Sequence, residues 1–353
     1  MTSRRLPLLC SLLLTAAVAC APTLAQSAAS EPLKLVGKTD LAGYTGDFDH
    51  FAVDLAGGRL FLAAEDHGTL EVFDLKSGKH LKTIKESIDT PHSIFFMPDK
   101  NRLLVTDSGE SMTKVLDATT YKVVDTIKLV PGADSIGYDS ANKHLYIVTG
   151  GKDVKMNECY LSEIDPETGK HIGDLKFDSN HTEAMAVEQN GPHLYINVTD
   201  KNYLAVVDKA TLKVEATWPI KEAEQNAPIA MDEQAHRLFV VTRKPGKLVV
   251  LNADTGASIA SFTAPERTDE VVFDKANKRV YVLGGQGYIG VFQEDDPDHY
   301  RELARIPSGP GAKTGILVPQ LNRLFVAQSP GEAKTGAAVL QFAVAPASGA
   351  VAN

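Results

Sequence analysis

A short motif recurs seven times along the chain, and this recurrence constrains the fold more than any other feature of the sequence. Each copy opens with an arginine or a histidine and continues with mostly apolar residues, rich in Leu, Val, Phe and Tyr. The copies are residues 59–63, 102–106, 144–148, 193–197, 237–241, 279–283 and 323–327. Successive copies begin 43, 42, 49, 44, 42 and 44 residues apart. Strands placed by chance would not keep such even spacing, so the chain is a tandem array of one supersecondary unit.

Each unit predicts four short strands. The residues of the motif favour β-structure, and helical periodicity is nearly absent from the chain. A third strand follows the motif and ends at an Asp or Asn that begins a turn, and a fourth strand comes after that turn; the turn residues are Asp74, Asp117, Asp165, Asp208 and Asn252. Such side chains accept hydrogen bonds from the N–H groups of their own turns, so we interpret them as structural. Seven units of this kind predict an all-β, seven-bladed β-propeller with four-stranded antiparallel blades.

The last unit predicts how the ring closes. It offers three strands, near residues 314–318, 323–327 and 338–344, and its fourth strand is missing. Residues 33–39 precede the first full unit and have the character of an outer strand. We predict that this N-terminal strand pairs with the last blade and locks the ring, which would remove exposed sheet edges. The propeller would then span residues 33–346, and residues 347–353 would form a flexible C-terminal tail.

The N-terminal residues have the three parts of a secretory signal peptide. Arg4 and Arg5 are followed by an apolar run at residues 6–18, and Ala25 ends a fair cleavage site. We expect residues 1–25 to be removed and the mature protein to be periplasmic or secreted. In an alternative, the residues up to Cys20 act as a lipobox and Cys20 carries a lipid anchor. No later stretch approaches the roughly 18 apolar residues of a membrane span, so we expect no transmembrane segment.

The charge balance argues against a nucleic-acid partner. Removal of residues 1–25 takes away Arg4 and Arg5 and no acid, which leaves 34 basic against 45 acidic residues and a net charge of −11. Binding to phosphate backbones needs clustered Lys and Arg, which this sequence does not offer. Cys159 would be the one cysteine of the mature chain, so we expect no internal disulfide and an inert thiol. We also expect a monomer.

Several second strands share an ending that is typical of one propeller family. Tyr146–Gly150 reads Tyr-Ile-Val-Thr-Gly, Tyr195–Asp200 reads Tyr-Ile-Asn-Val-Thr-Asp, and Phe239–Arg243 reads Phe-Val-Val-Thr-Arg. Turns such as Asp165–Gly169 have the pattern Asp-x-x-Thr-Gly. With these motifs the sequence resembles the YVTN (YncE-like) family of exported seven-bladed propellers over about residues 33–346. The resemblance implies a periplasmic or surface-associated protein, often one without a demonstrated reaction.

The repeat also predicts a ring of functional side chains. Aligned on the leading Arg or His, the units place one residue per blade at the start of the innermost strand, ten positions earlier. These residues are Asp49, His92, Asp134, Glu183, Ala227, Asp269 and Lys313. Innermost strands begin near the central channel, so we expect four carboxylates and one histidine at one level of the ring. Carboxylates gathered round an axis repel one another and need a balancing cation, His or Lys.

A divalent cation is one way to balance such a ring. Oxygen ligands favour Ca²⁺ or Mg²⁺, and the candidate ligands are Asp49, Asp134, Glu183 and Asp269. Nitrogen ligands would shift the preference toward a transition metal, and the candidates are His50, His92 and His181. The alternative is that these residues are solvated round a wide channel mouth, where they cap loops or pair with Lys313.

The loops after the second strands would lie on the same face as the ring. Glu65 and Arg243 belong to such loops, and residues 152–160 form an insertion that explains the 49-residue spacing. Insertions in one repeat often mark the binding face. Arg243 and Lys244 could clamp a carboxylated or phosphorylated ligand, but we interpret them first as a solvated turn.

The sequence predicts a binding protein rather than an enzyme. The ligand-binding candidates are Asp49, His50, His92, Asp134, Glu183, Arg243, Asp269 and Lys313. No Gly-x-Ser-x-Gly elbow is present, a Ser/His/Asp set cannot be identified without geometry, and we assign no catalytic residue. We expect a non-enzymatic propeller that binds a small ligand or a periplasmic protein at the channel mouth. The alternative hypothesis is a divalent-metal-dependent hydrolase or lyase, such as a lactonase, with His50 or His92 as its base.

Overall fold

The computed structural model describes residues 1–2, 31–109, 112–331 and 335–347. From residue 31 onward the chain forms seven four-stranded antiparallel sheets, so the predicted seven-bladed propeller is confirmed. Within the described residues the helical segments are four 3₁₀ turns of three residues each, and no helix is long and apolar enough to cross a membrane. The predicted cleavage site, the lipobox at Cys20 and residues 348–353 of the predicted tail lie outside the described residues.

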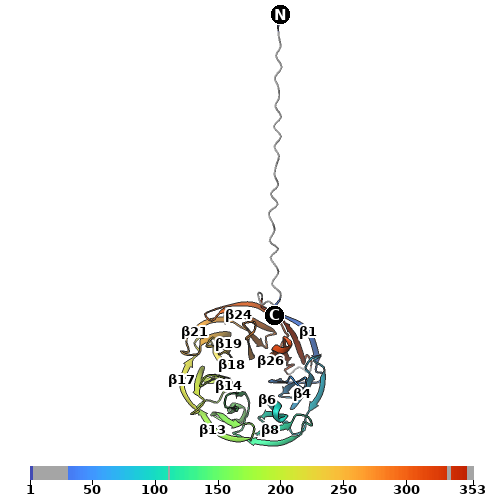
Figure 1. The fold of residues 1–353 in the computed structure, drawn as a ribbon, viewed down its shortest axis with the longest axis vertical. Helices are drawn as coiled ribbons and strands as arrows, with labels where there is room; N and C mark the ends of the chain where they lie inside the picture. The colour runs from blue at the N-terminus through green and yellow to red at the C-terminus, as the bar shows by residue number, and fades with distance from the viewer. Residues whose placement is uncertain (3–30, 110–111, 332–334, 348–353) are drawn as a thin grey trace. The chain divides into compact units, whose positions relative to one another are not determined.

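In blades 1 to 6 the strands follow sequence order from the channel to the rim. The innermost strands are β2 (Phe51–Asp54), β6 (Pro91–Met97), β10 (Ile136–Asp139), β14 (Thr182–Val187), β18 (Glu224–Asp232), β22 (Thr268–Asp274) and β26 (Ala312–Val318). The second strands carry the recurrent motif and are β3 (Arg59–Ala64), β7 (Arg102–Asp107), β11 (His144–Gly150), β15 (His193–Val198), β19 (Arg237–Lys244), β23 (Arg279–Gly284) and β27 (Arg323–Gln328). Figure 1 shows β6, β14, β18 and β26 next to the central channel.

The third and outer strands complete the sheets. The third strands are β4 (Thr69–Asp74), β8 (Met112–Asp117), β12 (Cys159–Asp165), β16 (Tyr203–Asp208), β20 (Gly246–Asn252), β24 (Tyr288–Asp296) and β28 (Ala338–Val344). The outer strands of blades 1 to 6 are β5 (His80–Ile84), β9 (Val123–Lys128), β13 (Lys170–Phe177), β17 (Lys213–Pro219), β21 (Ser258–Thr263) and β25 (His299–Pro307).

The seventh blade takes its outer strand from the N-terminal side of the propeller. β1 (Leu33–Asp40) pairs antiparallel with β28, from Leu33 opposite Val344 to Asp40 opposite Ala338. The order of this sheet is therefore β1-β28-β27-β26, and β1 lies at the rim in Figure 1. That this pairing is what keeps the ring closed stays a prediction.

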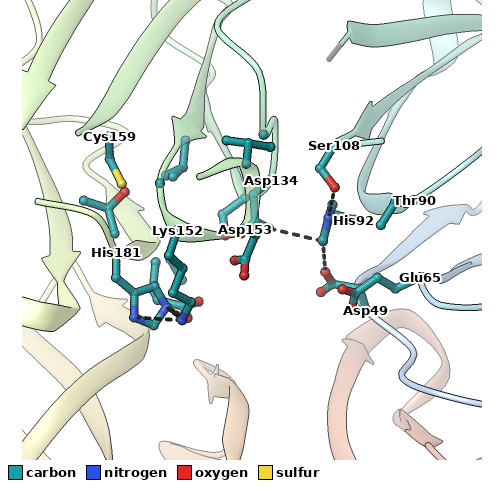
Figure 2. Close-up of a pocket in the computed structure, with 18 of the residues that line it drawn as sticks. Asp49, Glu65, Thr90, His92, Ser108, Asp134, Lys152, Asp153, Cys159 and His181 are labelled. Atoms are coloured by element: carbon teal, nitrogen blue, oxygen red, sulfur yellow. Dashed lines mark hydrogen bonds and ion pairs between the residues drawn. The ribbon is translucent and has the colours of Figure 1, made fainter. Parts of the chain in front are cut away.

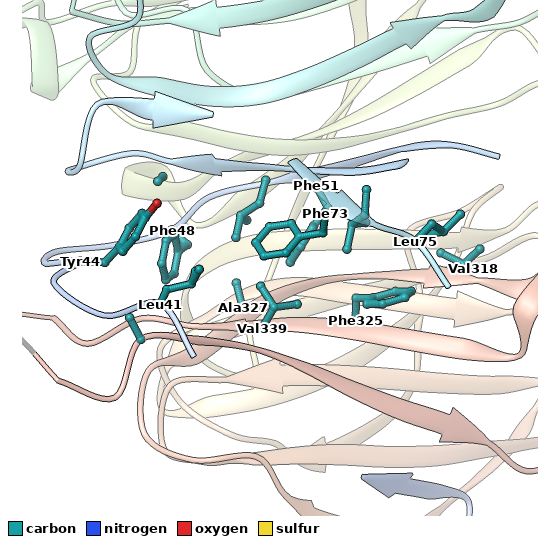
Figure 3. Packing of buried hydrophobic residues seen from close by; sticks show 14 residues of the cluster. Leu41, Tyr44, Phe48, Phe51, Phe73, Leu75, Val318, Phe325, Ala327 and Val339 are labelled. Carbon is teal, nitrogen blue, oxygen red and sulfur yellow. The ribbon is translucent and has the colours of Figure 1, made fainter. Parts of the chain in front are cut away.

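The hydrophobic core lies between neighbouring blades, because each sheet buries both of its faces. Between blades 7 and 1, Phe51 and Phe73 pack with Phe325 and Val339, as Figure 3 shows. Phe73 and Phe325 have no exposed surface, and full burial of such a side chain stabilises the fold by about 1.5–3 kcal/mol. Corresponding clusters fill each of the other interfaces between blades.

In some blades, the basic residue that leads the motif bonds to the next blade. Arg59 donates to Asp54 of its own blade at 2.7 and 2.9 Å and to the hydroxyl of Tyr121 in blade 2 at 3.0 Å. Arg279 of blade 6 donates to the carbonyl of Ala345, beyond the last strand of blade 7, at 2.6 Å. Others bond within their own blade, as Arg102 does to Asp117 at 2.6 Å and His144 to Glu163 at 2.7 Å.

Candidate functional site

The beginnings of the inner strands, with loops that follow second strands, surround a cavity of about 610 Å³. We call this region the channel mouth. All eight ligand-binding candidates from the sequence line it: Asp49, His50, His92, Asp134, Glu183, Arg243, Asp269 and Lys313. Side chains from blades far apart in the sequence therefore meet around one cavity, and its volume lies in the range of small-molecule sites.

Blade 5 contributes to the mouth from a different position than the other blades. Its aligned residue, Ala227, is fully buried, and Arg243 near the end of β19 takes its place in the ring. Arg243 Nη1 lies 2.8 Å from a carboxylate oxygen of Glu183, its Nη2 contacts Asp269, and its Nε donates to the carbonyl of Thr268 at 2.9 Å. All three side-chain nitrogens thus contact protein oxygens, and the interpretation of Arg243 as part of a solvated turn is wrong. The adjacent Lys244 is exposed.

Lys313 extends this chain of ion pairs toward blade 1. Its Nζ lies 2.5 Å from Asp269 and 2.9 Å from Asp47. Burial lowers the pKa of Lys313, but the charges of the two carboxylates outweigh burial and raise it. The same balance raises the pKa of Arg243 between Glu183 and Asp269. Both cations are therefore already neutralised by carboxylates of the protein.

Blades 1 and 2 contribute a second group, centred on Asp49. Its carboxylate lies 2.7 Å from Nδ1 of His92 and 3.3 Å from Nε2 of His50, whose Nδ1 lies 3.4 Å from Glu270. Burial raises the pKa of Asp49, but the charges of the two histidines lower it to about 2. Burial lowers the pKa of His50 and His92, but the neighbouring carboxylates raise each to about 10. The surrounding carboxylates therefore favour the protonated form of both imidazoles.

The seven positions of the ring almost alternate in charge. In blade order they are Asp49, His92, Asp134, Glu183, Arg243, Asp269 and Lys313. An odd number of positions cannot alternate throughout, and the like-charged neighbours are Asp134 and Glu183. Glu183 is paired with Arg243 and lies 2.7 Å from Nε2 of His181. Within the described residues, Asp134 has one ion-pair partner, His92 at 3.7 Å, so it is the least compensated carboxylate of the ring.

Two carboxyl groups of the mouth are held toward their neutral form. Burial raises the pKa of Asp134 to about 6; His92 opposes this rise, and the charges of Asp49 and Glu183 add to it. Burial and the charge of Asp49 raise the pKa of Glu65, in the loop after β3, to about 8. A proton or another positive charge is therefore favoured on this side of the mouth.

A serine that the sequence analysis did not single out joins this group. The hydroxyl of Ser108 lies 2.9 Å from Nε2 of His92, and Nδ1 of the same ring faces Asp49, as Figure 2 shows. One signal was available, because Ser108 directly follows a second strand, where loops of the mouth were expected. Its pairing with a histidine 16 residues earlier could not be inferred without geometry.

Three side chains could hold a metal ion in the part of the chain that the structure describes. Ligand atoms of Asp49, His92 and Asp134 all lie within 4.8 Å of one another. This set differs from the four predicted carboxylates, because Arg243 lies between Glu183 and Asp269. Its mixture of carboxylate and imidazole suits a transition metal better than Ca²⁺.

The insertion of blade 3 reaches the mouth as well. Lys152 and Asp153 line the cavity, and Lys152 Nζ lies 3.0 Å from Nε2 of His181, as Figure 2 shows. Cys159 lies at the edge of the same cavity but is 2% exposed, and burial raises the pKa of its thiol. A buried thiol of raised pKa is a poor nucleophile, in line with the expected inert role.

Comparisons with known proteins agree with the fold and say little about the mouth. No family model matches the chain. Over 112 residues, 32% of this chain and 31% of the relative, it is 27% identical to a protein of Salmonella typhimurium strain LT2 described as uncharacterized protein YncE. That match spans less than a third of the relative's length.

Solved structures share the architecture at low sequence identity. The chain matches a chain of Kuenenia stuttgartiensis hydrazine synthase with a TM-score of 0.71 and 16% identity, over 88% of this chain and 98% of that one. It matches a chain of a mitotic checkpoint complex with a TM-score of 0.70 and 15% identity, over 96% and 98%. At these identities the likeness shows the propeller fold alone.

Proposed function

We propose that this chain is an exported propeller of the YVTN (YncE-like) family and that its channel mouth binds a small polar ligand with a positive charge. The seven blades, the partial similarity to YncE and the signal-like residues 1–25 support the first part. Asp134 carries the second part, because its side chain lines the cavity, is 34% exposed and has one histidine 3.7 Å away as compensation.

A positive charge next to Asp134 would complete the alternation around the ring. It would separate Asp134 from Glu183, the one like-charged pair of neighbours, and so remove a repulsion that the protein itself does not balance. Arg243 and Lys313 are already bonded to carboxylates, so neither is free to hold an anionic ligand. The rigid blades hold these side chains in place before the ligand arrives, which reduces the entropic cost of binding.

Calorimetric titration with choline and with 3,3-dimethylbutanol, its uncharged isostere, tests this proposal. We expect choline to bind the mature protein and the isostere to bind at least about tenfold more weakly, a difference of about 1.4 kcal/mol. Asp134→Asn should weaken choline binding by a similar factor, and Asp165→Asn, in an outer turn, should leave it unchanged. Equal affinity for both compounds, no binding of either, or full choline affinity in Asp134→Asn would refute the proposal.

A divalent-metal-dependent hydrolase is the second candidate, and the Asp49, His92 and Asp134 set favours it. A metal there would polarise a carbonyl group of the substrate. Elemental analysis of protein purified without chelator, with melting curves before and after EDTA, is the test. A stoichiometric metal and a lower melting temperature after EDTA would support this candidate, and no metal with an unchanged melt would eliminate it.

A further inference from the structure

We propose that Ser108, His92 and Asp49 form a nucleophilic triad that hydrolyses a small carboxylic ester or thioester carrying a positive charge. The inference rests on the proposed function, because Asp134 would hold the charged end of the substrate. It goes beyond binding, because it assigns a reaction and three reacting groups to the mouth.

The three side chains have the order and the spacing of an acyl-transfer triad. The Ser108 hydroxyl lies 2.9 Å from Nε2 of His92, and the Asp49 carboxylate lies 2.7 Å from Nδ1. In such a triad serine attacks the carbonyl carbon, the imidazole takes its proton, and the carboxylate orients the imidazole. All three line the same cavity, and Figure 2 shows the serine and the carboxylate on opposite sides of the imidazole ring.

The loop that carries Ser108 is tied to buried groups. The Ser108 N–H donates to the carbonyl of Thr90 at 3.1 Å. Asp107, which has no exposed surface, accepts the N–H groups of Thr90 at 3.0 Å and Gly109 at 3.2 Å. The hydroxyl is therefore presented from a fixed backbone, which is what positioning of a nucleophile requires. The Thr90 side chain lines the cavity beside Gly109.

The position of Asp134 determines which substrate can react. Its carboxylate lies 3.7 Å from Nδ1 of His92, whose Nε2 faces the Ser108 hydroxyl. Within the described residues Asp134 has no other ion-pair partner, and its side chain is 34% exposed and lines the cavity. A positively charged end of a small substrate bound there would hold the rest of the substrate beside His92 and Ser108.

The proposed reaction is a hydrolysis, and water is its only co-substrate. Ser108 Oγ forms a bond to the acyl carbon while its proton moves to Nε2 of His92, and the bond to the leaving oxygen or sulfur breaks as that proton passes to the leaving group. Water then attacks the acyl-enzyme, its proton passes through His92 to Ser108 Oγ, and the carboxylic acid is released. No oxidant, reductant or further reactant is required.

Thiol release from acetylthiocholine and from its uncharged isostere, S-(3,3-dimethylbutyl) thioacetate, tests the triad and is measured with and without EDTA. We expect faster turnover of the charged thioester. Ser108→Ala should lower kcat/KM by about 1,000-fold or more, and Ser77→Ala, in an outer turn, should not change it. Asp134→Asn should slow the charged thioester more than the uncharged one, because it removes the anchor of the charged end. A fluorophosphonate probe should label wild-type protein at Ser108, as read by peptide mass mapping.

The outcomes separate this inference from the proposed function. Choline binding without thioester turnover or labelling would overturn the triad and leave the binding proposal intact. Turnover that persists in Ser108→Ala, or that EDTA abolishes, would overturn the triad in favour of a metal hydrolase. Loss of both choline binding and turnover would overturn both. The labelling measurement uses wild-type protein, so the test does not depend on how any variant folds.

Discussion

Acidic residues recur at two levels of this propeller, and the two sets behave in opposite ways. The turns between third and fourth strands in blades 1 to 5 begin with the same kind of side chain, in Asp74, Asp117, Asp165, Asp208 and Asn252. Each accepts hydrogen bonds from its own turn, as Asp165 does from the N–H of Glu167 at 2.8 Å and Asn252 from that of Thr255 at 2.9 Å. At the mouth the aligned residue changes from blade to blade, and the partners come from other blades.

The comparison shows how a repeat can build a site. A repeat position with the same kind of side chain in every blade makes the same local contacts each time. A position whose side chain varies can instead bring different residues from the seven blades together in one asymmetric cluster. The pKa shifts of the turn acids all have one direction, whereas those of the mouth acids are mixed, since that of Asp49 is lowered. Hydrogen bonds from its own turn lower the pKa of Asp165, whereas burial raises those of Asp134 and Glu65. The turn acids are stabilised as anions, and these two mouth acids are held toward the neutral form.

Arg243→Met should produce the largest effect, because it removes the cation between two carboxylates. Glu183 and Asp269 would then face the cavity without Arg243, and we expect a loss of about 2–4 kcal/mol in the free energy of unfolding. Urea denaturation measures the loss. A cost below about 1 kcal/mol would show that the mouth is as loosely coupled as an outer turn.

Lys244→Met is the matched control for this substitution. Lys244 is the next residue and is exposed, so we expect a change within about 0.5 kcal/mol. Combining Arg243→Met with Glu183→Gln and Asp269→Asn should recover part of the lost stability, because no unpaired charge would remain. If the combined variant were less stable than Arg243→Met, repulsion between the two carboxylates would not be the cause.

Alignment of the repeat located most residues of the ring, but it did not show which of them form ion pairs with one another. Asp49, His92 and Asp134 could be found because equivalent strand starts meet at the channel in any propeller. Alignment at the strand starts did not place Arg243 in the ring. This residue lies near the end of β19, which has eight residues where β3 has six, and the end of β19 reaches into the ring. Its partner Glu183 is 60 residues away, and side-chain pairing over such a distance leaves no periodic trace in the sequence.

The same limit explains why the sequence did not reveal Ser108 and why the candidate metal ligands differ from the four predicted carboxylates. Ser108 shares its place in the repeat with Ser329, so the position alone does not distinguish it, and its role depends on which nitrogen of His92 it meets. Equal alignment of four carboxylates suggested four equal ligands, but charge pairing divides them, since Arg243 takes Glu183 and Asp269. The architecture follows from periodicity, which is a property of the whole chain, whereas the chemistry depends on a few individual contacts.

Glu65 at the mouth and Asp165 in an outer turn should change stability with pH in opposite directions. Glu65 has a pKa of about 8 in the folded protein against 4.5 for the ordinary group, and His50 and His92 have about 10 against 6.5. Between these limits the folded state binds more protons than the unfolded chain, so stability falls as pH rises from about 5 to 10. The pKa of Asp165 is lowered from 3.8, so its contribution is lost only as pH falls below that value.

Melting curves of wild type and Glu65→Gln across this pH range test whether stability falls as pH rises. The variant should be less dependent on pH between about 4.5 and 8, because it has no proton to lose there. Asp165→Asn should leave this part of the curve unchanged. An identical slope in Glu65→Gln and wild type would mean that burial does not hold Glu65 in its neutral form.

We expect the smallest effect from substitutions in the outer turns, which test whether the acidic side chains there have a structural role alone. Asp165→Ala should cost about 1 kcal/mol in urea denaturation, because the turn loses the acceptor for the N–H of Glu167. Asp165→Asn should cost much less, since Asn252 makes the corresponding bonds in blade 5. Neither variant should change choline affinity, because the turn lies away from the residues that line the mouth. If Asp165→Asn were as costly as Asp165→Ala, the negative charge itself would matter at the turns, and the two sets of acids would differ less than their contacts indicate.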